Sequence, residues 1–405
     1  MRRFYTEVFE SNFKENRQML FVMGPRQVGK TTTSLAVKDL WGNGFYFNWD
    51  KKADRAKILE GSDAIANEIG LHQVLEKQPL VIFDEIHKYF DWKNFLKEFY
   101  DSYPNQAKIL VTGSARLDVF KKGSDSLMGR YFHYRYHPLS VAEIAHPECV
   151  PISEIRPSPQ AIKEDQFQAL YEQGGFPDPF LKNDVRFSNR WKNLRFQQLF
   201  EEDIRDLARI QEIKQMELLA ELLRQQIGQL VSYESFAKKV KVSSPTIRHW
   251  FEVLKSFYYC FEVRPFSKNI TRSLLKEPKY YLWDWSFCEG NGSRFENLIA
   301  SHLLKAVHFW NDSGLGAYEL NFLRDKEKRE VDFVVVKNGD PWILVEAKCA
   351  DSKHISPSLY YFQELTKAPY AFQVVLDMPY VNKSCFESIG KPLIVPARTL
   401  LSQLV

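Results

Sequence analysis

An unbroken apolar run at residues 19–23 opens the most informative pattern in the chain. It leads into a loop with glycine at both ends, residues 24–29, and a helix-compatible segment at 32–40 follows. Apolar runs of this length are typical of strands that are buried on both faces. A second apolar run occurs at 80–83, and residues 108–112 form a further strand-like segment. The pattern therefore predicts a three-layer α/β domain with a parallel sheet over residues 1–150.

The loop has the spacing G-x-x-x-x-G-K-T, in its proper position between a strand and a helix. Such a loop turns backbone N–H groups toward phosphate oxygens, and the helix N-terminus adds partial positive charge. We expect Lys30 to reach the β- and γ-phosphates of ATP and the Thr31 hydroxyl to ligate Mg²⁺. The predicted nucleotide-binding residues are Gly24, Pro25, Arg26, Gln27, Val28, Gly29, Lys30, Thr31 and Thr32.

Two carboxylates, Asp84 and Glu85, follow the apolar run at 80–83. The carboxyl edge of a parallel sheet is where ligands of such folds bind. We therefore expect Asp84 to hold the Mg²⁺ shell and Glu85 to orient and deprotonate the attacking water. Thr112 and Ser114, at the end of the run at 108–112, are candidates for contact with the γ-phosphate or the water.

These residues resemble the AAA-type P-loop ATPases, and more closely a bacterial and archaeal family whose ATPase precedes a C-terminal domain of unknown function. The resemblance is carried by residues 24–31, 83–85, 112–114, 129–130 and 138–140. It implies that Arg130 contacts the γ-phosphate, from the same chain or from a neighbouring subunit of a homo-oligomer. A structural role for Arg130 is an equally open interpretation.

Composition adds limits to this picture. The 405 residues are 44% hydrophobic, enough for several cores, and the net charge of +4 does not by itself indicate nucleic acid. The N-terminus lacks the apolar stretch of a signal peptide, and no apolar run is long enough to cross a bilayer. We therefore expect a cytoplasmic protein without membrane contact. The cysteines show no C-x-x-C spacing, so neither a zinc site nor a disulfide framework is indicated.

The middle of the chain has a different organisation. Four prolines at 147–159 indicate a linker, and we assign 151–210 to a linker and helical lid. Helical patterns at 216–227, 233–240 and 245–256, followed by strand patterns at 258–264 and 279–283, predict a winged-helix domain over 211–285. Residues 231–285 hold ten Lys/Arg against five Asp/Glu, and Arg248, Lys268, Arg272 and Lys276 lie where DNA phosphates would be met. Binding to DNA and a role in packing or in binding an unknown protein partner both stay open.

The last part, 286–405, predicts helix, three strands, helix and strand. Glu296 lies on the first helix, Asp332 interrupts one apolar strand, and Glu346 and Lys348 interrupt the next. Strand side chains alternate between faces, so Glu346 and Lys348 point the same way. A buried carboxylate has to be paired or bind a cation, because burying it alone costs several kcal/mol.

This arrangement resembles the PD-(D/E)XK nuclease superfamily with its restriction-endonuclease-like fold. The resemblance implies that Asp332, Glu346 and the Ala347 carbonyl hold Mg²⁺, that Glu296 completes the shell, and that Lys348 is catalytic. Two alternatives stay open: a buried salt-bridge network, and a nuclease fold reused for binding. The sequence thus predicts an ATP-hydrolysing AAA-type protein acting on or with DNA. The alternative is an ATP-switched protein-interaction module with an inactive nuclease-like domain.

Overall fold

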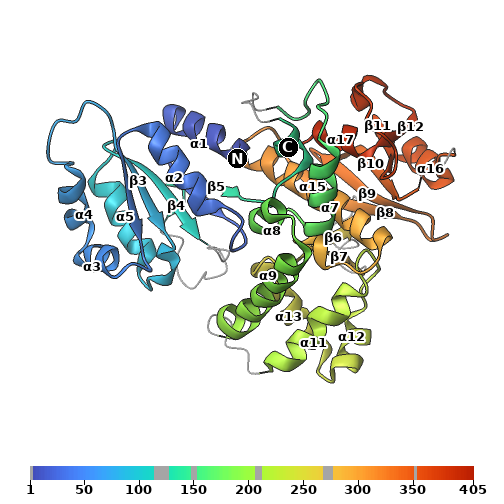
Figure 1. Cartoon of the computed structure of the whole chain (residues 1–405), viewed down its shortest axis with the longest axis horizontal. Helices are drawn as coiled ribbons and strands as arrows, with labels where there is room; N and C mark the ends of the chain where they lie inside the picture. The colour runs from blue at the N-terminus through green and yellow to red at the C-terminus, as the bar shows by residue number, and fades with distance from the viewer. Residues whose placement is uncertain (1–2, 114–126, 147–152, 206–211, 268–276, 351–353) are drawn as a thin grey trace. The chain divides into compact units, whose positions relative to one another are not determined.

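The chain forms two parts in the computed structural model, Met1–His137 and Pro138–Val405, here called the N-terminal and C-terminal units. The residues described are 3–113, 127–146, 153–205, 212–267, 277–350 and 354–405. Figure 1 colours the chain from the first unit in blue to the second in green, yellow and red.

The N-terminal unit is built on a parallel sheet with strand order β2-β3-β4-β1-β5, which confirms the predicted α/β class. Its strands are β1 (Met19–Met23), β2 (Gly44–Asn48), β3 (Leu80–Asp84), β4 (Lys108–Gly113) and β5 (Tyr131–Arg135). Its helices are α1 (Phe4–Glu15), α2 (Lys30–Trp41), α3 (Lys52–Glu60), α4 (Ser62–Ile69), the 3₁₀ turn η1 (Ile86–Lys88) and α5 (Trp92–Ser102). Every residue of β1 and β3 is buried, as expected for strands covered on both faces.

The strand register brings the predicted nucleotide-binding residues to one edge of this sheet. Met23, which precedes the loop, pairs with Gly113, and Asp84 pairs with Thr112. One face of the sheet carries an aromatic core in which Phe83 packs edge-on against Phe95 and Phe99 of α5. The core thus fixes the strands whose ends form the site.

The C-terminal unit has a mixed seven-stranded sheet with the order β12-β11-β10-β9-β8-β6-β7. Its strands are β6 (Cys260–Pro265), β7 (Lys279–Leu282), β8 (Tyr318–Arg324), β9 (Glu330–Lys337), β10 (Asp340–Lys348), β11 (Tyr370–Val375) and β12 (Pro392–Pro396). Strands β8, β9 and β10 are antiparallel neighbours, and β11 pairs in parallel with β10 after a helical crossover. The order from α15 to β11 is therefore helix, three antiparallel strands, helix and parallel strand.

Helices precede and surround this sheet (Figure 1). They are α6 (Val141–Ala145), α7 (Glu164–Gln173), α8 (Pro177–Lys182), α9 (Val185–Gln198), the π-helical η2 (Leu199–Ile204), α11 (Ile213–Arg224), α12 (Tyr233–Val240), α13 (Ser244–Ser256), the 3₁₀ turns η3 (Trp285–Phe287) and η4 (Cys385–Glu387), α15 (Asn291–Asp312), α16 (Pro357–Thr366) and α17 (Ala397–Ser402). No helix among the described residues is both long and apolar enough to span a membrane.

Two structural features lie across the domain boundaries expected from the sequence. Residues 138–146 pack with the C-terminal unit, since the Pro138 carbonyl accepts a hydrogen bond from Lys305 (3.0 Å) and His146 contacts the Ser402 carbonyl (2.9 Å). The boundary expected at 285–286 crosses a continuous sheet, since the Phe266 amide donates to a carbonyl of β8 (2.8 Å). The two strands expected as the wing therefore belong to the same sheet as the strands that follow.

Candidate functional site

The loop between β1 and α2 forms a tight backbone cradle. Gln27 and Gly29 have positive φ angles of 59° and 103°, which turn the chain inward. Gly24 lies so close to the neighbouring strand end that an added Cβ would be 2.3 Å from the Tyr136 carbonyl oxygen. Glycine is required at residue 24 because a side chain there would collide with backbone.

Lys30 is the first residue of α2, and its ammonium group lies over this loop. Its side chain is buried, and Nζ donates to the carbonyls of Gly24 (2.9 Å) and Pro25 (2.7 Å). The loop thus holds a positive charge at the point where its own backbone turns. This is the lysine that the sequence assigns to phosphate binding.

Asp84 ends β3 as a buried carboxylate that accepts three side-chain hydroxyls. Thr31 Oγ1 donates to Oδ2 at 2.9 Å, the Tyr46 hydroxyl donates to the same oxygen at 2.5 Å, and Thr112 donates to Oδ1. Burial, and next the hydrogen bond to Asp84, raise the pKa of Tyr46 well above its usual value. Tyr46 was not predicted from the sequence. Its position on β2, two residues before the residue that pairs with Asp84, is the signal that could have found it.

Glu85 follows with a left-handed backbone, φ 57°. Its carboxylate lies 3.4 Å from Lys88 Nζ and 3.8 Å from His87 Nε2. Burial lowers the pKa of His87 to about 4, so this imidazole is neutral near pH 7. Glu85 therefore has one ammonium group and one neutral ring beside it.

Arg3 is a second residue that the sequence did not reveal. Its buried guanidinium donates to the Val28 carbonyl of the loop (3.0 Å) and to the His137 carbonyl (2.6 Å), and it lies over the Tyr136 ring. It ties the phosphate-binding loop to the chain segment after β5 and adds a cation close to the loop.

Arg130 does not join this site within its own unit. It precedes β5, at the edge opposite the loop, roughly 16 Å away for a strand of this length. There its guanidinium forms a two-bond pair with Asp101 of α5, at 2.8 and 2.9 Å. Thr112 contacts Asp84 as described, and Ser114 lies outside the described residues.

The C-terminal acidic residues are brought together by the sheet. Asp332 on β9 and Glu346 on β10 occupy facing positions, given the register of the flanking pair Phe333 and Val345. Asp332 Oδ2 accepts the Ala347 amide at 2.8 Å, and Lys348 Nζ donates to Glu346 Oε1 at 2.8 Å. The other oxygen of Glu346, Oε2, is buried and has no hydrogen-bond partner among the described residues.

Glu296 of α15 is close enough to Asp332 for the two carboxylates to interact electrostatically. Burial, and next the Asp332 carboxylate, raise the pKa of both Glu296 and Glu346. Burial raises the pKa of Asp332 as well. Such shifts arise where several carboxylates share one poorly solvated site. Nevertheless, no three acidic, histidine or cysteine side chains among the described residues are placed to hold one metal ion.

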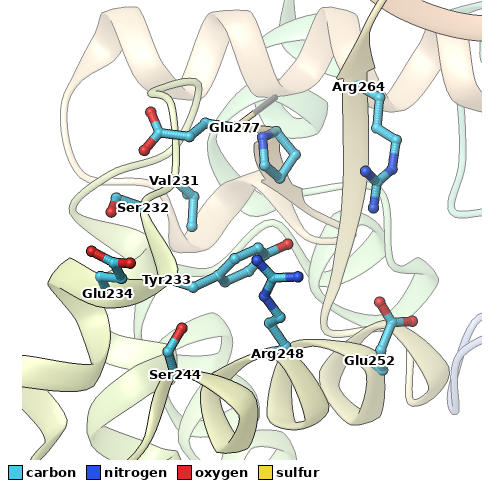
Figure 2. Close-up of a pocket in the computed structure, with 10 residues that line it drawn as sticks. Val231, Ser232, Tyr233, Glu234, Ser244, Arg248, Glu252, Arg264 and Glu277 are labelled. Atoms are coloured by element: carbon cyan, nitrogen blue, oxygen red, sulfur yellow. The ribbon is translucent and has the colours of Figure 1, made fainter. Parts of the chain in front are cut away.

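A cavity of about 410 Å³ lies between the helices α12 and α13 and the strand β6. Figure 2 shows Arg248 and Arg264 extending into it, with Glu234, Glu252 and Glu277 around them. Arg248 lies over the Tyr233 ring at 5.0 Å, and Arg264 pairs with Glu262 at 2.7 Å. The lining carries both signs of charge. The predicted basic loop, with Lys268, Arg272 and Lys276, lies outside the described residues.

Three family models match consecutive segments of the chain. Residues 16–145 match an AAA domain, 164–289 a domain of unknown function, DUF8612, and 291–380 another, DUF4143. The first match covers the cradle, Asp84 and Glu85, and supports an AAA-type ATPase domain. The C-terminal acidic residues on β9 and β10 fall in the third.

Similar proteins include Uncharacterized protein Rv2008c of Mycobacterium tuberculosis, 23% identical over 84% of this chain and 72% of the relative. Uncharacterized protein MJ1544 of Methanocaldococcus jannaschii is 23% identical over 76% of this chain and 73% of its own. Among solved structures, the Aeropyrum pernix ORC1 protein in complex with DNA matches at a TM-score of 0.31 and 12% identity, over 74% of this chain and 91% of that one. AMPPCP-bound DnaA from Aquifex aeolicus matches at 0.34 and 11%, over 62% and 87%. Scores this low do not establish a common arrangement of domains.

Proposed function

We propose that the N-terminal unit binds ATP with Mg²⁺ and hydrolyses it. The observation that carries this proposal is the convergence, at one sheet edge, of a glycine cradle, the Lys30 ammonium group, the Thr31 hydroxyl and the carboxylates Asp84 and Glu85. The match of residues 16–145 to an AAA domain supports the same activity.

The donor set fits Mg²⁺, because Thr31 Oγ1 and Asp84 Oδ2 are hard oxygen ligands 2.9 Å apart at the mouth of the loop. When bound, Mg²⁺ neutralises charge on the phosphate oxygens. In our proposal Lys30 exchanges the carbonyls of Gly24 and Pro25 for phosphate oxygens. Glu85 orients a water molecule and accepts its proton.

Two substitutions test this assignment. Lys30→Ala should abolish nucleotide binding, and Glu85→Gln should bind ATP but lose about 10²-fold or more in hydrolysis rate. Lys38→Ala, which removes a lysine that is 29% exposed from the same helix, is the matched control and should behave as wild type. Normal ATPase rates in both test variants would reject the proposal.

Arg130 acts, in this proposal, on a neighbouring subunit, because it lies at the far edge of its own sheet. Arg130→Ala and Glu85→Gln should each be inactive alone. A mixture of the two variants should regain hydrolysis, because some subunit interfaces then pair an intact Glu85 on one subunit with an intact Arg130 on the other. If Arg130→Ala alone hydrolyses ATP at the wild-type rate, its pair with Asp101 is its whole role.

We further propose that the C-terminal unit has a restriction-endonuclease-like fold that acts on DNA. The order from α15 to β11 supports it, and so do the facing carboxylates Asp332 and Glu346, with a buried oxygen that lacks a partner. Those two carboxylates, with the Ala347 carbonyl, would hold Mg²⁺, while Lys348 positions water. Asp332→Ala and Lys348→Ala should each remove Mg²⁺-dependent cleavage of plasmid DNA and leave ATPase activity intact. If the wild type cleaves no nucleic acid, the fold serves binding.

For the helices α11–α13 with β6 and β7 we propose DNA binding as a winged helix. Arg248→Ala and Lys268→Ala should then weaken binding and each reduce the salt slope by about one. The mixed charge around Arg248 favours the second candidate, a protein segment that carries both signs of charge. Unchanged DNA affinity in both variants would select that candidate.

A further inference from the structure

Glu296, Glu330, Asp332 and Glu346 form a group that we call the acidic cluster. It contains a buried cation, Lys279, from the segment that precedes α15. Lys279, the first residue of β7, is 2% exposed. Its Nζ lies 2.6 Å from Glu330 Oε1 and 3.7 Å from Glu296 Oε1. An ammonium group in this position neutralises carboxylates that would otherwise repel one another at close range.

The same segment surrounds Glu296 on its other sides. The Tyr281 hydroxyl of β7 donates to Glu296 Oε1 at 2.7 Å. A Cβ added to Gly228 would lie 2.6 Å from that oxygen, so the turn after α11 approaches the carboxylate closely. Gly228, Lys279 and Tyr281 all precede residue 286, where the nuclease-like domain was expected to begin, and all fall within the DUF8612 match.

Lys279 acts on Asp332 through its charge, which counteracts the rise in the pKa of that carboxyl. The Ala347 amide of β10 donates a hydrogen bond to Asp332, and the Lys348 ammonium group of β10 donates one to Glu346. Glu346 is 7% exposed, and within the part of the chain that the structure describes its buried Oε2 has no hydrogen-bond partner. A buried carboxylate oxygen left in this way loses the stabilisation that water or a cation would give it. A cation bound between Asp332 and Glu346 would give this oxygen a partner.

We propose that Lys279 is a built-in cation of this cluster: it holds Glu296 and Glu330 in the absence of metal and limits a divalent ion to Asp332 and Glu346. The inference rests on the proposed metal site and adds a residue from the preceding segment to it. Removing the ammonium charge frees Glu296 and lowers the repulsion that a divalent cation meets. At separations of about 5 Å near a protein surface, that change corresponds to at least about tenfold in affinity.

The test measures Mn²⁺ binding to the full chain by calorimetry, without nucleotide. Lys279→Gln should bind Mn²⁺ at least about tenfold more tightly than wild type, and the added Asp332→Asn substitution should abolish that gain. Lys255→Gln is the matched control, because Lys255 is also a largely buried lysine between two glutamates, Glu252 and Glu262, and should leave Mn²⁺ affinity unchanged.

The outcomes separate the inference from the proposed function. Equal Mn²⁺ affinity in wild type and Lys279→Gln overturns the inference and leaves the proposed metal site standing. Absence of Mn²⁺ binding in both overturns both. If Lys279→Gln folds only when Mn²⁺ is present, as judged by circular dichroism, the ion replaces the lysine and the inference is supported. Lys279→Arg, which keeps the charge, should retain the wild-type affinity.

Discussion

The buried ion pair between Lys305 of α15 and Glu143 of α6 gives the sharpest stability prediction. The two side chains are 3% and 0% exposed, and Lys305 Nζ also donates to the Pro138 carbonyl (3.0 Å) and Ser140 Oγ (3.1 Å). Removing one partner leaves an uncompensated charge in the interior, which costs about 3–5 kcal/mol. We therefore expect Lys305→Met and Glu143→Leu each to lower the free energy of unfolding by about 4 kcal/mol.

The double variant should be far less unstable than the sum of the single ones. With both charges absent, the remaining cost is the loss of the Lys305 hydrogen bonds to the Pro138 carbonyl and Ser140 Oγ, about 2 kcal/mol. The coupling free energy between the two positions should therefore be at least about 3 kcal/mol. Urea unfolding of the full chain, followed by tryptophan fluorescence, measures it. The unfolding curve is also measured with ADP, which should stabilise the N-terminal unit that binds it. The transition that ADP does not shift is then assigned to the C-terminal unit.

Lys383→Met is the matched control within the same unit. Lys383 pairs with Glu387 at 3.7 Å, and both side chains are more than half exposed, so we expect a change within about 0.5 kcal/mol. If Lys305→Met costs no more than this control, or if the two single costs simply add, the pair is not buried in the way the structure describes.

Three further predictions concern single residues. Gly24→Ala should weaken ATP binding at least about tenfold, measured by calorimetry, since the new methyl group would displace backbone next to the loop, whereas Gly292→Ala, with open space around it, should be neutral. Tyr46→Phe should destabilise the nucleotide-free N-terminal unit by about 1.5–3 kcal/mol in urea, through loss of a hydrogen bond to a buried carboxylate, and an unchanged midpoint would contradict that bond. Burial lowers the pKa of His302 to about 4, so as the pH falls below 6.5 the unfolded chain takes up the proton before the folded chain does. The free energy of unfolding should therefore fall by up to about 3 kcal/mol between pH 6.5 and 4. His302→Gln should lack this part of the pH dependence.

The sequence by itself determined the elements that depend on local order. The strand, glycine loop and helix at 19–40, and the acidic end of the run at 80–84, lie where the pattern predicts them. Helix α12, Tyr233–Val240, has the predicted bounds. Apolar periodicity and turn residues act over a few positions, so they can be recognised in one sequence. Helices α3, α4 and α5 were not predicted, although the apolar residues Trp92, Phe95, Leu96 and Phe99 of α5 recur at helical spacing.

Only the tertiary structure decided which distant side chains meet. Tyr46 reaches Asp84, Arg3 reaches Val28, and Lys279 reaches Glu296 because sheet register and helix packing bring separate segments together. The strands β6 and β7 pair with the sheet that follows them, and no local pattern distinguishes that from a separate hairpin. Partners of buried charges are selected by three-dimensional proximity, since a charge in a poorly solvated interior is stable only beside a compensating group. Sequence spacing does not encode that proximity.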